Sequence, residues 1–420
     1  MRVRLTRAAR GDDSGAIAIL VALLAVVLIG MAAFAVDLGN AYAVKRKLSV
    51  GADAAALAAA TAASKALSVG SATCSTGTGQ ISPSSLQVAA QAAAQAEAVR
   101  ILGQNDLSGR ATVPSVTLTC TADDIRVAVS TAQSVPTFFA GVFGIADTNP
   151  VGSSTARAFV PAGAGGLRPI AACTDTVSSR YSPPTSSRPF LVFMDNSGNP
   201  CGSGSSGNWG ILNFDDQGQY DAAPTGPFDD PNCSNGGSAG CQALWMSSGY
   251  YGRVYVPNPS PFVTDPATRV AGRPGLAGST GQGVGNQFKT ALESMPGKVI
   301  SLPVAQWVAD PGSNARFGIT GIVSVRVCAV RSQNSYVTDP TPRAGECDNA
   351  VSGPPDRTPY SANLPNQTIS EYTWWTTGNN KYALWVEPVS YVTSGSSLPR
   401  SGCLFVVGCD LNTRAVELFR

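Results

Sequence analysis

The sequence contains no histidine, and charged residues make up only 13% of its 420 residues. Without histidine, the Ser-His-Asp and Cys-His arrangements of nucleophilic catalysis and histidine-based zinc sites cannot be formed. The acidic and hydroxyl residues that remain show no spacing typical of an active site. We therefore expect a protein that is not an enzyme, with no catalytic residues, no cofactor and no bound metal.

The chain also lacks a strong excess of charge of either sign, since its formal net charge is +2. No basic patch is interleaved with aromatic residues, so we expect no nucleic-acid partner. The glycine-rich segment Gly281-Gln282-Gly283-Val284-Gly285 lacks the spacing of a phosphate-binding loop. These patterns make no small-molecule substrate evident.

The ten cysteines include no Cys-x-x-Cys pair, which excludes the usual zinc-ribbon and thioredoxin-like motifs. An even number of dispersed cysteines is typical of disulfide bonding in an oxidising compartment. Proximity in the sequence suggests four pairs but leaves the connectivity open: Cys74–Cys120, Cys233–Cys241, Cys328–Cys347 and Cys403–Cys409.

What the chain does have is a long hydrophobic run near its N-terminus. Residues 15–36, GAIAILVALLAVVLIGMAAFAV, contain no charged residue. About twenty apolar residues in a helix cross the hydrocarbon core of a bilayer, which is roughly 30 Å thick. We predict a cytoplasmic lead over residues 1–14 and a transmembrane helix over residues 15–36. The protein is then a cell-membrane protein with lipid as a partner.

The basic residues around this run predict its orientation. Four arginines lie among the first ten residues, and Lys45-Arg46-Lys47 follow the run at a distance. The larger positive charge on the N-terminal side favours a single pass with a cytoplasmic N-terminus and an extracytoplasmic C-terminal bulk. Ala33-Phe34-Ala35 fits the end of a cleaved signal peptide, which is the competing interpretation. The length of the run and the helical pattern that continues past Ala35 favour a retained anchor.

The helical pattern continues without proline into an alanine-rich segment, residues 37–67. Apolar and small residues recur there at steps of three and four, at Val44, Leu48, Ala52, Ala55 and Ala59. Alanine favours the helix and lets a neighbouring backbone approach closely. We therefore predict a stalk helix with a packing stripe, although a solvated helix without a partner would give the same pattern.

The remaining chain divides into two regions. Residues 68–166 predict a small α+β region, with a helix at 84–102, several short strands and a linker, PAGAGG, at 161–166. Residues 167–420 alternate short apolar segments with loops rich in Gly, Pro, Asn and Ser, which is typical of antiparallel β structure. The strands expected there are 190–194, 209–214, 253–256, 298–304, 319–330, 382–386 and 404–407, with one helix at 288–295.

The predicted fold class is therefore α+β. An N-terminal transmembrane helix continues into an alanine-rich stalk helix, followed by a small α+β unit and a β-rich, disulfide-containing extracytoplasmic domain.

The N-terminal residues also resemble a known family, the Tad/Flp pilus-assembly proteins of the TadE/TadG-like group. The segments that are similar to its N-terminal pattern are Gly15, Ala35-Val36-Asp37-Leu38-Gly39, Tyr42, Lys45-Arg46-Lys47-Leu48 and Ala52–Ala59. Later segments that are similar to parts of these proteins are VPTFFAGVFGIAD at 135–147, GNWGILNFDD at 207–216 and PGKVISLPVAQWV at 296–308.

The resemblance implies a non-enzymatic, membrane-anchored component of a Tad/Flp-type, type IV-like pilus assembly system. It would act through helix packing and its exported domain, with other pilus-assembly or pilin-like helices as partners. The fifth residue after Gly15 is Leu20, where a prepilin has Glu, and this favours an assembly component over a pilin subunit. The alternative is an anchored extracytoplasmic binding or adhesion protein unrelated to pilus assembly. The candidate assembly and packing residues are Gly15, Asp37, Lys45, Arg46, Lys47, Leu48, Asp53 and Leu57.

Overall fold

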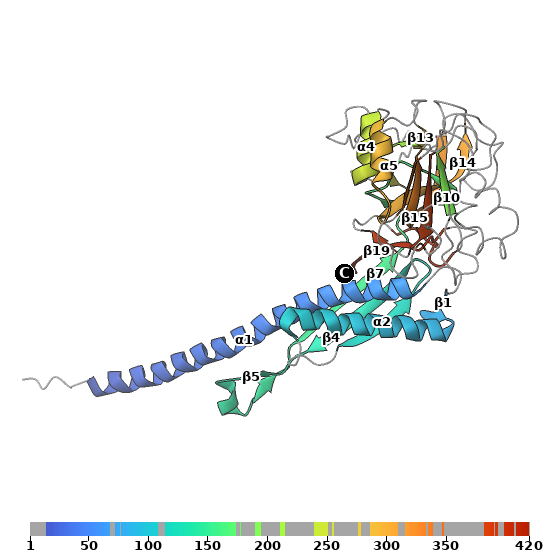
Figure 1. Ribbon diagram of the computed structural model, residues 1–420. Coiled ribbons are helices and arrows are strands. Elements are labelled where there is room, and N and C mark those ends of the chain that lie inside the picture. The colour runs from blue at the N-terminus through green and yellow to red at the C-terminus, as the bar shows by residue number, and fades with distance from the viewer. Residues whose placement is uncertain are drawn as a thin grey trace, which may run out of the picture.

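The computed structural model shows a long helix that projects from a folded body containing two main sheets (Figure 1). The residues that the structure describes are 14–67, 72–75, 77–107, 114–173, 177, 190–194, 211–214, 239–250, 254–255, 276–278, 286–309, 316–332, 335–338, 347, 382–389, 391–393, 399–406 and 409–419.

The projecting element is α1, one unbroken helix over Ser14–Ala66, as the sequence predicts. Every large apolar side chain from Ile19 to Leu38 is exposed, and this half of the helix extends away from the folded body (Figure 1). The helix is long and apolar enough to cross a membrane. Its second half is buried along one side, at Leu48, Ala52, Ala55, Ala56, Ala59, Ala60 and Ala63.

The buried half of α1 packs against both a second helix and a sheet. Helix α2 (Ser84–Leu102) runs beside α1 and buries Ala90, Ala94, Ala98 and Leu102. Because alanine carries only a methyl group, the two helix backbones approach closely along this line. The two helices cover one face of a five-stranded sheet, and the helix layer and the sheet share one hydrophobic core.

This first sheet has the strand order β18–β19–β7–β4–β3. Successive side chains of a strand point to opposite faces of the sheet, and this alternation decides which face the helices cover. Val116, Leu118, Val127 and Val129 are all buried toward α1 and α2. The strand bounds are β3 Ser115–Cys120, β4 Asp124–Ala132, β7 Val151–Phe159, β18 Tyr391–Thr393 and β19 Thr413–Leu418.

Small elements complete this part of the molecule. They are the β1 (Thr73–Ser75) and β2 (Gln80–Ser82) ribbon, the π-helical turn η1 (Gly103–Leu107), and a hairpin of β5 (Val135–Pro136) and β6 (Asp147–Thr148) around the 3-10 helix η2 (Ala140–Phe143).

The second sheet is built around β15, a strand of 17 residues that pairs with β13, β14, β16 and β17. Helices α4 and α5 lie side by side against it, with Met246, Phe288 and Leu292 in its core (Figure 1). The bounds are β9 Ala172–Cys173, β10 Phe190–Met194, β11 Leu212–Asn213, α4 Ala239–Ser248, β13 Leu276–Gly278, α5 Asn286–Glu293, β14 Val299–Ala309, β15 Arg316–Ser332, β16 Ser335–Thr338 and β17 Tyr382–Pro388.

The chain path crosses the predicted division at residue 166. The sequence places residues 391–418 in the C-terminal domain, but β18 and β19 belong to the first sheet, where β19 pairs with β7. The strand β7 pairs with β4 along its other edge, so β19 satisfies the remaining row of backbone groups. The two regions are thus tied together by the C-terminus of the chain.

Three local expectations also differ from the structure. Within the predicted linker, β8 (Gly163–Ala164) pairs with β12 (Val254–Tyr255), and Ala164 is buried. Residues 404–406 form turns around a disulfide rather than a strand. A second helix in the C-terminal region, α4, accompanies the predicted one, α5, because Trp245 and Met246 supply buried contacts that a short glycine-flanked segment does not reveal in sequence.

The structure joins Cys74 to Cys120, Cys328 to Cys347, and Cys403 to Cys409, which are three of the pairs suggested by sequence proximity. Cys241 is also disulfide-bonded. Cys233 lies outside the described residues.

Candidate functional site

The candidate site is the point where the exposed half of α1 meets the folded body, and Asp37 lies at its centre. Asp37 is the first residue after the predicted span 15–36, and only 8% of it is exposed. Its carboxylate accepts backbone hydrogen bonds from Phe138 at 2.8 Å, Phe139 at 2.9 Å and Ala140 at 2.7 Å. These residues lie more than one hundred positions away, so Asp37 ties the helix to the β5–β6 hairpin.

The carboxylate fits this position because η2 begins at Ala140. The first N–H groups of a helical turn have no partner within the turn, and an acidic side chain supplies the acceptor. Burial raises the pKa of Asp37, but the three backbone N–H donors together lower it, and the net shift is downward. Asp37 is therefore ionised at neutral pH, and its charge stabilises the turn.

The hairpin loop is also closed by its own backbone. Thr137 N donates to Ala146 O at 3.0 Å, and Ile145 N donates to Ala140 O at 3.1 Å. Gly144 has φ +84°, a left-handed conformation that glycine adopts without strain. The loop is thus an ordered structure that Asp37 holds against α1.

Replacing Asp37 with alanine is expected to release the hairpin from α1. The amides of Phe138, Phe139 and Ala140 lose their acceptor, so their hydrogen exchange should become faster by about tenfold or more, while the five-stranded sheet stays protected. Hydrogen–deuterium exchange of the full chain in detergent measures this. Asp53→Ala is the matched control, because Asp53 is an acidic residue of the same helix away from the hairpin. Equal exchange rates of these three amides in the two variants would contradict the proposed role of Asp37 in holding the hairpin.

The other predicted residues of α1 occupy three different environments. Lys45, Arg46 and Lys47 are exposed, about two turns beyond Asp37. Leu48 is fully buried and lies against Gly152 of β7, and Leu57 packs at the edge of the same core. Gly15 lies in the first turn of α1. Their proposed role in assembly with other helices stays a prediction.

A comparison with protein families matches residues 15–62, which is nearly all of α1, to the family described as "Putative Flp pilus-assembly TadE/G-like". We call residues 15–62 the TadE/G-like segment, because they are similar to this family. No curated protein and no solved structure matches the chain. The matched segment contains Asp37, the basic cluster and most of the alanine stripe, so it associates the chain with Flp pilus assembly.

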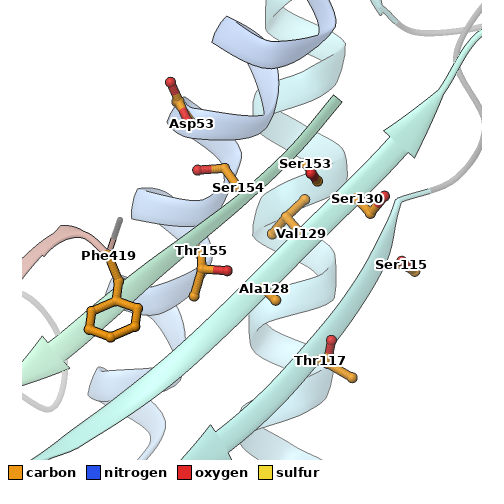
Figure 2. Close-up of a pocket in the computed structure, with 10 residues that line it drawn as sticks. All are labelled: Asp53, Ser115, Thr117, Ala128, Val129, Ser130, Ser153, Ser154, Thr155 and Phe419. Carbon is orange, nitrogen blue, oxygen red and sulfur yellow. The ribbon is translucent and has the colours of Figure 1, made fainter. Parts of the chain in front are cut away.

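Asp53 of the TadE/G-like segment lines a shallow groove of about 440 Å³ (Figure 2). Asp53 comes from α1 itself, whereas several of the other lining residues are hydroxyl side chains on the sheet face opposite the helices: Ser115, Thr117, Ser130, Ser153 and Thr155. Among its lining residues Asp53 is the one acid, so the groove holds no pair of carboxylates. It has the composition of a solvated sheet face.

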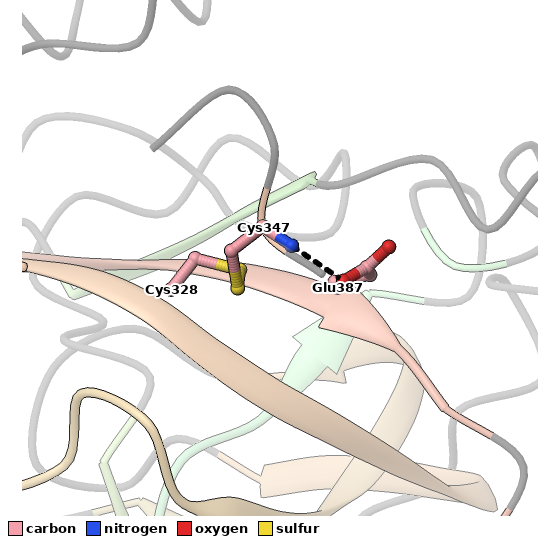
Figure 3. A group of neighbouring side chains, drawn as sticks. All are labelled: Cys328, Cys347 and Glu387. Carbon is pink, nitrogen blue, oxygen red and sulfur yellow. Dashed lines mark hydrogen bonds between the residues drawn. A yellow bond between two sulfur atoms is a disulfide. The ribbon is translucent and has the colours of Figure 1, made fainter. Parts of the chain in front are cut away.

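A second cluster, Cys328, Cys347 and Glu387, resembles a metal site by ligand type (Figure 3). The two sulfurs are joined in a disulfide, and a metal needs thiolates. Glu387 Oε2 accepts a hydrogen bond from Cys347 N at 3.0 Å, which holds the chain at the disulfide. The cluster is therefore a structural brace.

Tryptophans of the C-terminal region are the residues that we would expect a binding or adhesion protein to present to a ligand, and those whose side chains the structure describes are buried. Trp245 packs edge-on against Tyr250 and near Phe214, and Trp385 lies within β17. Trp209, Trp374 and Trp375 lie outside the described residues.

Sequence reasoning missed two contacts of the TadE/G-like helix. One is the Asp37 tie, although both partners lie in the segments that carry the family resemblance. The other is Arg414, whose Nη1 donates to the carbonyls of Ser64 and Leu67 at 2.8 Å each at the end of α1. The sequence signal for the first contact was Asp37 itself, which is an acidic residue at the end of an apolar run. The turn that it contacts is uncharged and contains glycine. Nothing local indicates the second.

Proposed function

We propose that the chain is a non-enzymatic, membrane-anchored component of a Tad/Flp-type pilus assembly system. The observation that carries this proposal is the TadE/G-like match, which falls on a helix whose two halves have opposite surroundings. The first half exposes every large apolar side chain, and the second half buries its alanine stripe within the same chain. Such a helix suits an anchor that carries a rigidly attached exported body.

The division of α1 bears on how the protein would meet its partners. The alanine stripe is already covered by α2 and the sheet, so lateral packing against other pilus-assembly or pilin-like helices would use the first half, from Ala18 to Leu38, in the membrane. The arginine-rich lead favours an N-terminus in the cytoplasm and the folded body outside. The disulfides fit that oxidising side.

Deletion and complementation in the native host test this function. We expect deletion to reduce surface pili, counted by electron microscopy, to background, and the full chain to restore them. A chain in which residues 1–36 are replaced by a cleavable signal peptide keeps the exported body but loses the anchor, so it should not restore pili. Active alkaline phosphatase fused to the C-terminus would report the orientation.

Two outcomes would overturn the proposal. Normal piliation in the deletion strain, together with binding of the exported body to a glycan or surface ligand, would support the adhesion alternative. Saturable turnover that one Asp or Ser substitution abolishes would instead identify an enzyme.

A further inference from the structure

The β5–β6 hairpin exposes an apolar loop. Between Val135 and Ala146 the chain has no charged residue. Val142 and Phe143 are each 83% exposed and Phe138 is 69% exposed, while Phe139 and Ile145 are about half exposed. Water-exposed apolar residues gathered in one ordered loop mark a surface that another apolar phase covers.

The position of the hairpin indicates which phase that is. Figure 1 shows the hairpin protruding from the folded body beside α1, on the side toward the projecting half of the helix. Asp37 bonds to the hairpin one residue after the apolar run ends. The exposed side chains of the loop therefore stand at the level where α1 leaves the hydrocarbon core, beside Val36 and Leu38, which are also exposed.

The order of residues along α1 agrees with a membrane surface at this level. Tyr42 is exposed just beyond Asp37, and the exposed cluster Lys45-Arg46-Lys47 follows about 12 Å past Asp37. At the surface of an anionic leaflet, apolar residues are expected at the edge of the hydrocarbon core. Aromatic residues and then basic residues are expected further out, among the headgroups. A loop that faces only water would not need its aromatic side chains at the level of the membrane surface.

We propose that residues 137–146 are a second membrane contact, in which Phe138, Phe139, Val142, Phe143 and Ile145 insert into the lipid interface beside α1. The inference rests on the anchoring role proposed for α1. Two attachment points, a helix and a loop tied to it by Asp37, would fix the tilt and rotation of the exported body relative to the bilayer. A single helix with a free body leaves both undetermined.

Lipid photocrosslinking in the full chain tests the proposal. A benzoylphenylalanine is placed at Phe143, at Ile29 within the apolar run, or at Val88, which is exposed on α2. The protein is reconstituted in vesicles of phosphatidylcholine and phosphatidylglycerol that contain an alkyne-tagged phospholipid. We expect severalfold more tagged adduct at Phe143 than at Val88, close to the yield at Ile29. Asp37→Ala should lower the yield at Phe143 and leave that at Ile29 unchanged.

The three positions separate the possible failures. No adduct at Ile29 would overturn the proposed anchor itself. Adduct at Ile29 with none at Phe143 would overturn the second contact and keep the anchor. Crosslinks from Phe143 to a second copy of the chain, or to another protein in the native membrane, would likewise overturn the lipid contact and make the hairpin a protein-docking loop.

Discussion

Replacing Arg414 with methionine is expected to destabilise the folded body by about 3–5 kcal/mol, since it breaks a buried ion pair by removing one partner. Arg414 is 1% exposed, and its Nη2 donates to Asp410 Oδ2 at 2.8 Å. Its Nη1 binds the carbonyls of Ser64 and Leu67, where the last turn of α1 has no partners of its own. The substitution leaves a buried carboxylate and two helix-end carbonyls without this guanidinium.

Denaturant unfolding of the full chain in detergent, followed by tryptophan fluorescence, measures this loss. Arg100→Met is the matched control, because the Arg100–Glu97 pair lies on the surface of α2 and its removal should cost less than about 1 kcal/mol. Arg414→Lys is not expected to restore stability, since an ammonium cannot span Asp410 and the end of α1 as a guanidinium does. Equal loss in Arg414→Met and Arg100→Met would contradict this account.

The second large effect is expected at Gly152, where β7 meets α1. A Cβ built at this position would lie 2.5 Å from the carbonyl carbon and 2.6 Å from the carbonyl oxygen of Leu48. Both atoms belong to the helix backbone, so no side-chain rearrangement can make room. Gly152→Val should therefore push α1 off the sheet and cost about 3 kcal/mol or more, at or above the upper end of the usual range for overpacking.

The neighbouring Ser153→Val variant is the control for this effect. Ser153 is exposed on the opposite face of β7, so valine there adds the same β-branched side chain without a clash, and the change should stay within about 0.5 kcal/mol. The same denaturant series compares the two variants. Leu48→Ala combined with Gly152→Val should recover little of the loss; full recovery would show that the Leu48 side chain, not its backbone, sets the spacing.

Much of the secondary structure could be predicted from the sequence. The run from Gly15 to Leu67 has an unbroken helical pattern, and α2 begins and ends as expected at Ser84 and Leu102. The strands β10 and β17 also lie where the short apolar runs place them. These features depend on the side chains of neighbouring residues, so local periodicity is enough to find them.

The candidate site was less accessible to sequence reasoning. Asp37 stands out as an acid at the end of an apolar run, but its partners at Phe138, Phe139 and Ala140 follow about a hundred residues later. The contact forms because β4 and β7 carry the hairpin between them to the same end of the sheet as the middle of α1. No local pattern encodes that meeting.

The sequence by itself determined that the chain begins with a membrane-length apolar helix, that this helix continues into an alanine stripe, and that its N-terminal segment is TadE/G-like. Only the tertiary structure decided what the stripe packs against, where β19 pairs and which turn Asp37 holds. Composition and period set which face of a helix or strand is apolar, whereas the partner of that face depends on which surfaces and edges the rest of the fold leaves open.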